Sequence, residues 1–121
     1  MHLKSIIEIS SELKDLTSRA QSDKLAPSDF SGATITLSNI GMVGGTTLAP
    51  VITTGQVCIG AIGRIQTLPR FNKSNQVIAE KIVTVNFAAD HRVIDGATLA
   101  RFVTKWKGYL ESPGTMAAQL R

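Results

Sequence analysis

The feature that most constrains this fold is an apolar stretch, residues 77–89, that runs directly into the polar turn Asp90-His91-Arg92-Val93-Ile94-Asp95-Gly96. Branched and aromatic side chains make this stretch the strongest strand signal in the chain. Beyond the turn, apolar residues recur at three- and four-residue steps and predict an amphipathic helix that ends before Pro113. Those apolar residues are Leu99, Phe102, Val103, Trp106 and Leu110. A strand that enters a helix through a polar turn favours a layered fold with both α and β elements.

A second helix is predicted at the start of the chain, where residues 3–20 carry apolar side chains on one face and polar ones on the other. The apolar residues are Leu3, Ile6, Ile7, Ile9, Leu13, Leu16 and Ala20. The polar segment 21–32, which contains Pro27, is expected to end this helix and form a loop. At the other end of the chain, residues 115–121 are expected to form a further helical turn or to fray.

Two more strands are predicted between the helices. Residues 33–40 alternate between hydroxyl and aliphatic side chains, which is typical of a strand with two unlike faces. Residues 57–68 form the other strand candidate, in which Gly60 and Gly63 indicate a bulge, a bend or something packed against the backbone. Residues 71–76 resemble a hairpin connection into 77–89.

Composition excludes several classes of function. The net charge of +4, from 13 basic and 9 acidic residues, is scattered along 121 residues, so no nucleic-acid surface is expected. No apolar run reaches the roughly 18 residues that span a bilayer, and no secretory signal is recognisable. The single cysteine, Cys58, suits a reducing compartment and is expected to be a buried structural thiol.

His91 is the first candidate for chemistry, because an imidazole titrates near neutral pH and can exchange a proton with a substrate. Asp90 and Asp95 flank it in the turn. The alternative is structural: a histidine beside acidic residues at a helix start is often a surface residue, and Asp95 can accept hydrogen bonds from the free N–H groups of the helix.

Ser38 is the second candidate, in the run Thr36-Leu37-Ser38-Asn39-Ile40-Gly41. It is not in a G-x-S-x-G motif, which argues against a hydrolase nucleophile. Its hydroxyl is suited either to donating a hydrogen bond to an oxyanion or to satisfying the turn backbone. The glycine-rich run 41–45 permits close approach of a ligand but matches no nucleotide-binding motif.

No metal site is predicted either. The only histidines are His2 and His91, neither lies in a metal-ligand spacing, and Cys58 has no nearby partner.

The heptad 90–96 and the Ser38-Asn39-Ile40-Gly41 turn together resemble the C-terminal half of the catalytic domain of the dihydrolipoamide acyltransferases. These proteins are the core subunits of 2-oxo acid dehydrogenase complexes. Segments 49–52, 59–63 and 68–71 extend the resemblance over essentially the whole chain. Residues 44–46, 69–72 and 106–111 make the chain most similar to the branched-chain member. The resemblance implies an α/β fold with a two-layer mixed β-sheet and flanking helices, part of a chloramphenicol-acetyltransferase-like fold.

For the reaction, the resemblance implies transfer of an acyl group, most simply a branched-chain one, between dihydrolipoamide and coenzyme A. His91 would be the general base and Ser38 would stabilise the tetrahedral intermediate. Asp95 would organise the histidine loop, through Arg92. Coenzyme A would bind as a substrate, and the residues expected to contact it are Ser38, Asn39, Met42, Gly63 and Ile65. The lipoyl group would be carried on a separate domain, and no metal is implied.

For the assembly, the resemblance implies active sites between subunits of a trimer, and trimers that build a cubic or dodecahedral core. Residues 1–121 would be the C-terminal half of the catalytic domain, with little activity alone, and the lipoyl and subunit-binding domains would lie outside it. Expected partners are the lipoyl domain, further copies of the chain and, through the absent domains, the dehydrogenase and dihydrolipoamide dehydrogenase subunits. The expected location is the mitochondrial matrix, with a bacterial cytoplasm as the alternative. A noncatalytic core scaffold is the competing function.

Overall fold

The computed structural model describes residues 4–119. The chain divides into two units, residues 33–103 and residues 1–32 with 104–121, and each is described by itself. Within residues 4–119, no helix combines the length and the apolar character needed to cross a membrane.

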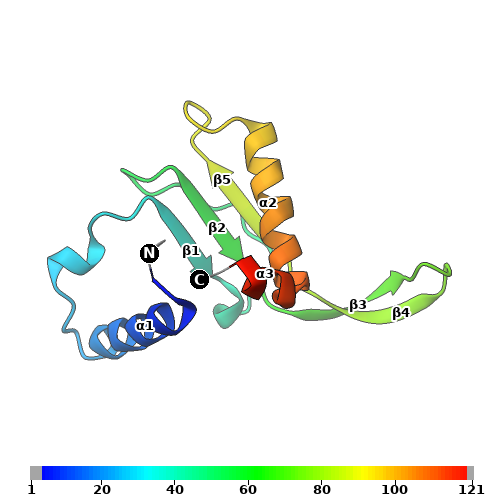
Figure 1. Ribbon diagram of the computed structural model, residues 1–121, viewed down its shortest axis with the longest axis horizontal. Coiled ribbons are helices and arrows are strands. Elements are labelled where there is room, and N and C mark those ends of the chain that lie inside the picture. Colours follow the sequence, from blue (N-terminus) through cyan, green and yellow to red (C-terminus); the bar gives the residue numbers. More distant parts are fainter. Residues whose placement is uncertain (1–3, 120–121) are drawn as a thin grey trace. The chain divides into compact units, whose positions relative to one another are not determined.

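The larger unit contains a three-stranded mixed sheet in the order β1-β2-β5 (Figure 1). The strands are β1 (Ile35–Asn39), β2 (Cys58–Ile62) and β5 (Val85–Ala89). β1 runs parallel to β2, and β5 runs antiparallel to it. The central strand contains the buried apolar residues of this sheet, Cys58, Ile59 and Ala61. The predicted mixed sheet is therefore confirmed.

Helix α2 (Gly96–Glu111) follows β5, as the apolar periodicity predicted. Its Phe102 ring meets the Phe87 ring of β5 edge to face, with centroids 5.6 Å apart. A Cβ on Gly60 would lie 2.6 Å from the Phe87 ring and 3.0 Å from the Leu37 side chain. Gly60 thus leaves room for two apolar side chains over the centre of the sheet, on the face that receives α2.

The two long strands predicted at 57–68 and 77–89 are wrong, because each divides into two. The first becomes β2 and β3 (Gln66–Phe71), and the second becomes β4 (Val77–Ile82) and β5. β3 and β4 pair with each other in a separate two-stranded ribbon that extends away from the main sheet (Figure 1). The predicted hairpin connection between Phe71 and Val77 is confirmed.

Both strands break at the same level for one physical reason. The Gly63 N–H donates to the Thr84 carbonyl at 2.9 Å, which joins the two break points. A Cβ on Gly63 would lie only 2.1 Å from the Thr46 carbonyl oxygen, so another segment of backbone passes directly over the break. Gly63 signals the first break in the sequence, whereas Val83 and Thr84 keep strand propensity through the second break, which only the tertiary contact explains.

In the other unit, helix α1 (Ile6–Gln21) begins at Ser5, whose hydroxyl accepts from the Glu8 N–H while the Glu8 carboxylate accepts from the Ser5 N–H. This capping box fixes the start of the predicted helix; Leu3 lies outside the described residues. A short 3-10 helix, η1 (Pro27–Phe30), lies in the predicted loop.

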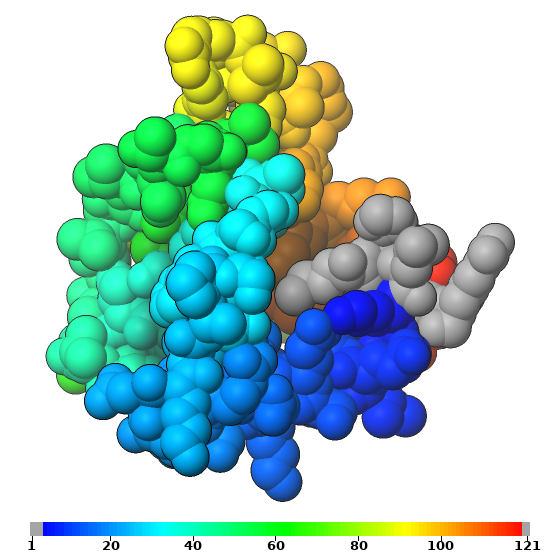
Figure 2. All heavy atoms as spheres, turned by 90° about the vertical axis from the view of Figure 1, so that its left-hand side faces the viewer, coloured from blue at the N-terminus to red at the C-terminus, as the bar shows by residue number. Residues whose placement is uncertain are grey.

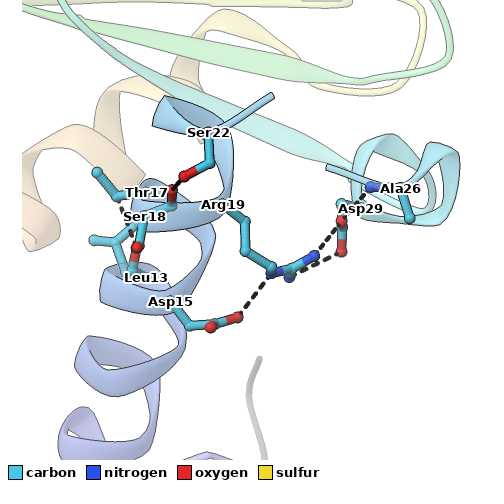
Figure 3. A network of polar contacts seen from close by, with 8 residues as sticks. All are labelled: Leu13, Asp15, Thr17, Ser18, Arg19, Ser22, Ala26 and Asp29. Atoms are coloured by element: carbon cyan, nitrogen blue, oxygen red, sulfur yellow. Dashed lines mark hydrogen bonds and ion pairs between the residues drawn. The ribbon is translucent and has the colours of Figure 1, made fainter. Parts of the chain in front are cut away.

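Arg19 ties that loop to the end of α1 (Figure 3). Its guanidinium donates to Asp15 at 2.9 Å and to Asp29 at 2.7 and 3.3 Å. Asp29 also accepts from the Ala26 N–H at 2.8 Å. The ion pairs hold the pKa of Asp29 below its usual range, so the carboxylate stays charged at neutral pH.

The last element of this unit is α3 (Pro113–Gln119), which confirms the further helical turn predicted near the C-terminus. The Tyr109 hydroxyl of α2 donates to the Gln119 side chain. Residues 120 and 121 lie outside the described part of the chain.

Candidate active site

Ser38 lies near the end of β1, where it pairs with Ala61 of β2. Alternation along the strands places its side chain on the face opposite α2. This face is polar: Thr36 Oγ1 donates to Gln56 Oε1 at 2.5 Å, and Asn86 Nδ2 donates to Thr47 Oγ1 at 2.8 Å. Ser38 is half-buried, and among residues 4–119 no group hydrogen-bonds its hydroxyl. That hydroxyl is therefore available to a ligand.

A tight glycine turn follows Ser38 and packs backbone to backbone against the end of β2. It contains the 3-10 turn η2 (Gly41–Val43) and Gly44, whose φ of +90° favours glycine. The Arg64 N–H donates to the Gly45 carbonyl at 2.8 Å. A Cβ on Gly41 would lie 2.8 Å from Arg64 Cα, so no larger residue fits at that contact.

This packing brings the predicted coenzyme A residues together at one end of the sheet. Ser38 and Asn39 end β1, Gly63 follows β2, and Met42 and Ile65 stand on the two packed segments. Met42 is 82% exposed and Ile65 is 70% exposed. The five residues therefore lie together at this end of the sheet, an arrangement called the coenzyme A edge below, and the apolar side chains of Met42 and Ile65 are exposed to solvent.

His91 stands on a turn at the end of β5, and hydrogen bonds to Asp90 build this turn. The Asp90 N–H donates to the Val57 carbonyl at 2.9 Å, and the Asp90 carbonyl accepts from Val93 and Ile94 at 3.0 and 2.9 Å. His91 is exposed, and within the described ranges no hydrogen bond engages its imidazole. The turn thus holds the backbone of His91 while the ring remains free for a substrate.

Arg92 pairs with Asp90, not with Asp95. Its Nε and Nη2 donate to the Asp90 carboxylate at 2.7 to 3.1 Å, and its own N–H donates to Asp90 Oδ1 at 3.0 Å. These bonds lower the pKa of Asp90 to about 2. The route through Arg92, considered for an organising role of Asp95, is therefore wrong, since the shorter two-residue offset lets Arg92 reach Asp90 first.

Asp95 caps α2. Its Oδ1 accepts from the Thr98 N–H at 2.6 Å, which confirms the capping alternative considered for this residue. The Thr98 backbone and hydroxyl, then the Ala97 N–H and the charge of His91, lower the pKa of Asp95. Asp95 is thus ionised at neutral pH and fixes the helix that follows His91.

The serine and histidine turns lie at opposite ends of the sheet. Ser38 is in register with Ala61, which is in register with Asn86 of β5. Ala89, the last residue of β5, is three residues further along the strand, or about 10 Å at the usual rise, and His91 lies beyond it in the turn. The two turns stand apart in Figure 1, and the histidine turn protrudes, in yellow, at the top of Figure 2. One chain therefore does not bring His91 to Ser38.

Two features of this unit were not predicted as site residues. Arg64 lies between Gly63 and Ile65 at the serine end; the signal that identifies it is the lack of any other charge nearby in the sequence.

An apolar cavity of about 220 Å³ lies on the α2 face and includes the Cys58 side chain. Its lining consists of Ile35, Val57, Cys58, Ile94, Thr98, Leu99 and Phe102. Cys58 is 5% exposed, as predicted for a buried thiol, and burial raises its pKa. Among the described residues, no cluster of three metal-ligating side chains occurs.

The fold and these two turns define a class of protein. Residues 1–118 match the 2-oxoacid dehydrogenases acyltransferase family (catalytic domain), and the chain belongs to this family. The relatives include the lipoamide acyltransferase component of the mitochondrial branched-chain alpha-keto acid dehydrogenase complex of Caenorhabditis elegans, which is 49% identical over 98% of this chain. The Bos taurus counterpart is 46% identical over all of it. This chain spans 26% and 25% of those two proteins.

Solved structures of catalytic cores have the same fold as this chain. A dihydrolipoamide acetyltransferase of Azotobacter vinelandii superimposes with a TM-score of 0.85 and 26% identity over 95% of this chain and 47% of that one. The cubic core of a pyruvate dehydrogenase multienzyme complex gives a TM-score of 0.84 at 27% identity, over 94% of this chain and 46% of that one. The fold is the chloramphenicol-acetyltransferase-like α/β fold of these catalytic cores, as expected from the sequence.

Proposed function

We propose that this chain takes part in acyl transfer between a dihydrolipoyl group and coenzyme A, with His91 as general base and Ser38 as oxyanion donor. The observation that carries the proposal is the match of residues 1–118 to an acyltransferase catalytic domain, combined with two turns that leave an imidazole and a hydroxyl free for ligands.

The proposed chemistry needs little more than these two groups. The His91 imidazole removes the proton of the attacking thiol, whose pKa near 8.5 requires only a modest base. The thiolate adds to the thioester carbonyl, and the resulting oxyanion accepts a hydrogen bond from the Ser38 hydroxyl. The intermediate then expels the second thiolate, which takes the proton back from the imidazolium. One C–S bond forms and one breaks, so the site mainly has to position two long thiol arms.

We also propose that each site forms between two copies of the chain, within a trimer. The position of His91 beyond the end of β5, which is itself about 10 Å past the level of Ser38, supports this arrangement, because a shared substrate must touch both groups. A neighbouring copy that presents its serine end to the histidine turn satisfies the chemistry without bending the sheet. Coenzyme A would then pass the edge formed by Ser38, Asn39, Met42, Gly63 and Ile65.

Asp95 is proposed as a positioning residue. It lies four residues after His91, and the Azotobacter structure was solved to study the catalytic roles of a serine, a histidine and an asparagine, the last two also four residues apart. An asparagine oxygen accepts the same helix N–H bond as an aspartate, but it does not supply a charge. A role in capping α2 and so fixing the histidine turn suits both residue types.

The remaining expectations rest on the relatives. We propose that residues 1–121 are the C-terminal half of the catalytic domain, since they span 47% of the solved acetyltransferase chain. The transferred group is proposed to be a branched-chain acyl group and the location the mitochondrial matrix, because the relatives most similar in sequence include mitochondrial branched-chain proteins. The lipoyl domain and the dehydrogenase subunits are proposed partners, and the core is proposed to assemble from trimers.

The test is His91→Ala in the full-length protein, assayed for acyl-coenzyme A formation with dihydrolipoamide. A general base should lose about 100-fold or more in turnover, and the exposed Lys14→Gln on α1 serves as a control that loses nothing. Unchanged turnover in His91→Ala would refute the proposal and favour a scaffold. A covalent acyl group on Ser38, detected by mass spectrometry after exposure to substrate, would instead indicate a hydrolase.

A further inference from the structure

The serine end of the sheet lies in an unusually neutral part of the chain. Between Asp29 and Arg64 the sequence contains no Asp, Glu, Lys, Arg or His. The glycine turn, the end of β1 and the whole of β2 fall within this segment. Arg64 is its boundary, and the next charged residue is Arg70. Between residues 30 and 69, Arg64 is therefore the one residue with a charged side chain.

The backbone fixes the place of Arg64 at this edge. Its N–H donates to the Gly45 carbonyl at 2.8 Å, and the position of a Cβ on Gly41 would lie 2.8 Å from both its N and its Cα. Its sequence neighbours Gly63 and Ile65 are two of the five residues of the coenzyme A edge. Its side chain is exposed, and throughout residues 4–119 no ion pair or hydrogen bond occupies the guanidinium.

An unpaired guanidinium in a neutral segment of the chain can discriminate between the two thiols of the proposed reaction. Coenzyme A carries phosphate groups, whereas the lipoyl arm is an uncharged amide. A guanidinium presents N–H donors in a fork that matches a phosphate and remains charged at all relevant pH values. Without nearby carboxylates in the surrounding segment to compete for it, Arg64 favours the phosphorylated thiol at this end of the sheet.

We infer that Arg64 binds a phosphate group of coenzyme A and so distinguishes coenzyme A from the lipoyl arm at the serine end. The inference rests on the proposed function and adds a residue that selects one of its two substrates. Arg64 touches the non-reacting part of the substrate, so its removal changes affinity and leaves the chemical step intact.

The test measures binding by calorimetry in the full-length protein, with coenzyme A and with pantetheine, which has the same thiol arm without phosphates. Arg64→Ser should weaken coenzyme A binding about threefold to tenfold, the range for an exposed charge-assisted contact. Its pantetheine affinity should equal that of the wild type. Lys73→Ser, which removes a cation from the hairpin connection, is the matched control and should bind both ligands normally. Added salt should weaken coenzyme A binding less in Arg64→Ser than in the wild type.

Three results overturn the inference: equal coenzyme A affinity in Arg64→Ser and wild type, an equal loss for pantetheine, or a wild-type protein that does not bind coenzyme A. Arg64→Gln, which keeps a long polar side chain, makes the same comparison if Arg64→Ser does not fold. Failure of the proposed function has a different signature, because the wild type would then bind coenzyme A but form no acyl-coenzyme A.

Discussion

Mixing two inactive variants tests whether His91 and Ser38 of different chains share one site. His91→Ala removes the base, and Ser38→Ala removes the oxyanion donor, each from the full-length protein. Through the register of β1, β2 and β5, Ser38 lies level with Asn86, about 10 Å before the end of β5, and His91 of the same chain lies beyond that end. A hydrogen-bonded group and its substrate lie within about 3.5 Å. The separation of His91 and Ser38 in one chain exceeds this distance by too much for side-chain rotation to bring both groups to one substrate.

The expected recovery follows from the symmetry of a trimer. In trimers that form at random from equal amounts of the two variants, half of the histidine turns and half of the serine turns are intact. About one quarter of the sites then combine an intact His91 with an intact Ser38. Each variant alone should lose about 100-fold or more. The mixed trimers should therefore be about 25-fold more active than either parent, or higher.

The assay is acyl-coenzyme A formation by the whole mixture of trimers obtained by joint refolding or coexpression of equal amounts, with no selection for mixed composition. As a control, the double variant carrying both substitutions is mixed equally with wild type. It should also give about one quarter of wild-type activity if sites are shared, and about one half if each chain forms its own site. Mixed single variants that are no more active than their parents would refute the shared site.

Three further predictions concern the turns that hold these residues. Because the hydrogen bonds from Arg92 keep the pKa of Asp90 at about 2 against 3.8 ordinarily, its ionised form stabilises the fold above about pH 4, and this contribution is lost as the pH falls towards 2. Urea unfolding of wild type and Asp90→Asn should differ at pH 7 and converge near pH 2; a constant difference would contradict this. Asp95→Asn should keep turnover within about threefold of wild type while Asp95→Ala falls further, since only the amide can cap the helix; equal losses would favour a charge role. Gly63→Ala, whose Cβ would meet a backbone oxygen at 2.1 Å, should lower the free energy of unfolding by more than about 2 kcal/mol, whereas Gly108→Ala, in open space on α2, should raise it by about 0.5 kcal/mol; comparable effects on urea unfolding would count against the close contact at Gly63.

The strand breaks show where local patterns stop being informative. Residues 77–89 read as one strand because each local window is apolar and branched, and those windows are indeed in strands. The break at Val83 and Thr84 depends on Gly63, some twenty residues earlier, which bonds to the Thr84 carbonyl. Strand propensity contains no term for such a partner, so the division into a main sheet and a separate ribbon was missed.

The candidate site was predicted unevenly for a similar reason. The sequence singled out His91, Asp95 and Ser38 as candidates, whose roles in the reaction remain proposals, and the capping role of Asp95 followed from its place before a helix. The partner of Arg92 was assigned wrongly, because two carboxylates flank it and only the turn geometry decides between them. For Arg64 the sequence shows only that no other charge is nearby, and its place beside the glycine turn comes from the structure, which packs its backbone against Gly41.

The direction of the strands accounts for the separation of the two turns. β1 and β2 are parallel, so the residues that follow them, the glycine turn and Gly63, meet at one edge of the sheet. β5 is antiparallel to β2, so the residue that follows it, Asp90, bonds to Val57 at the other edge. Each functional turn stands at the carboxyl end of its own strand, yet the topology sends them apart. Alternation of apolar and polar residues is the same in parallel and antiparallel strands, so no sequence pattern reveals this. If His91 and Ser38 act as proposed, a chain of this topology presents two half-sites at opposite ends of its sheet, and self-association is the simplest arrangement that makes both of them whole.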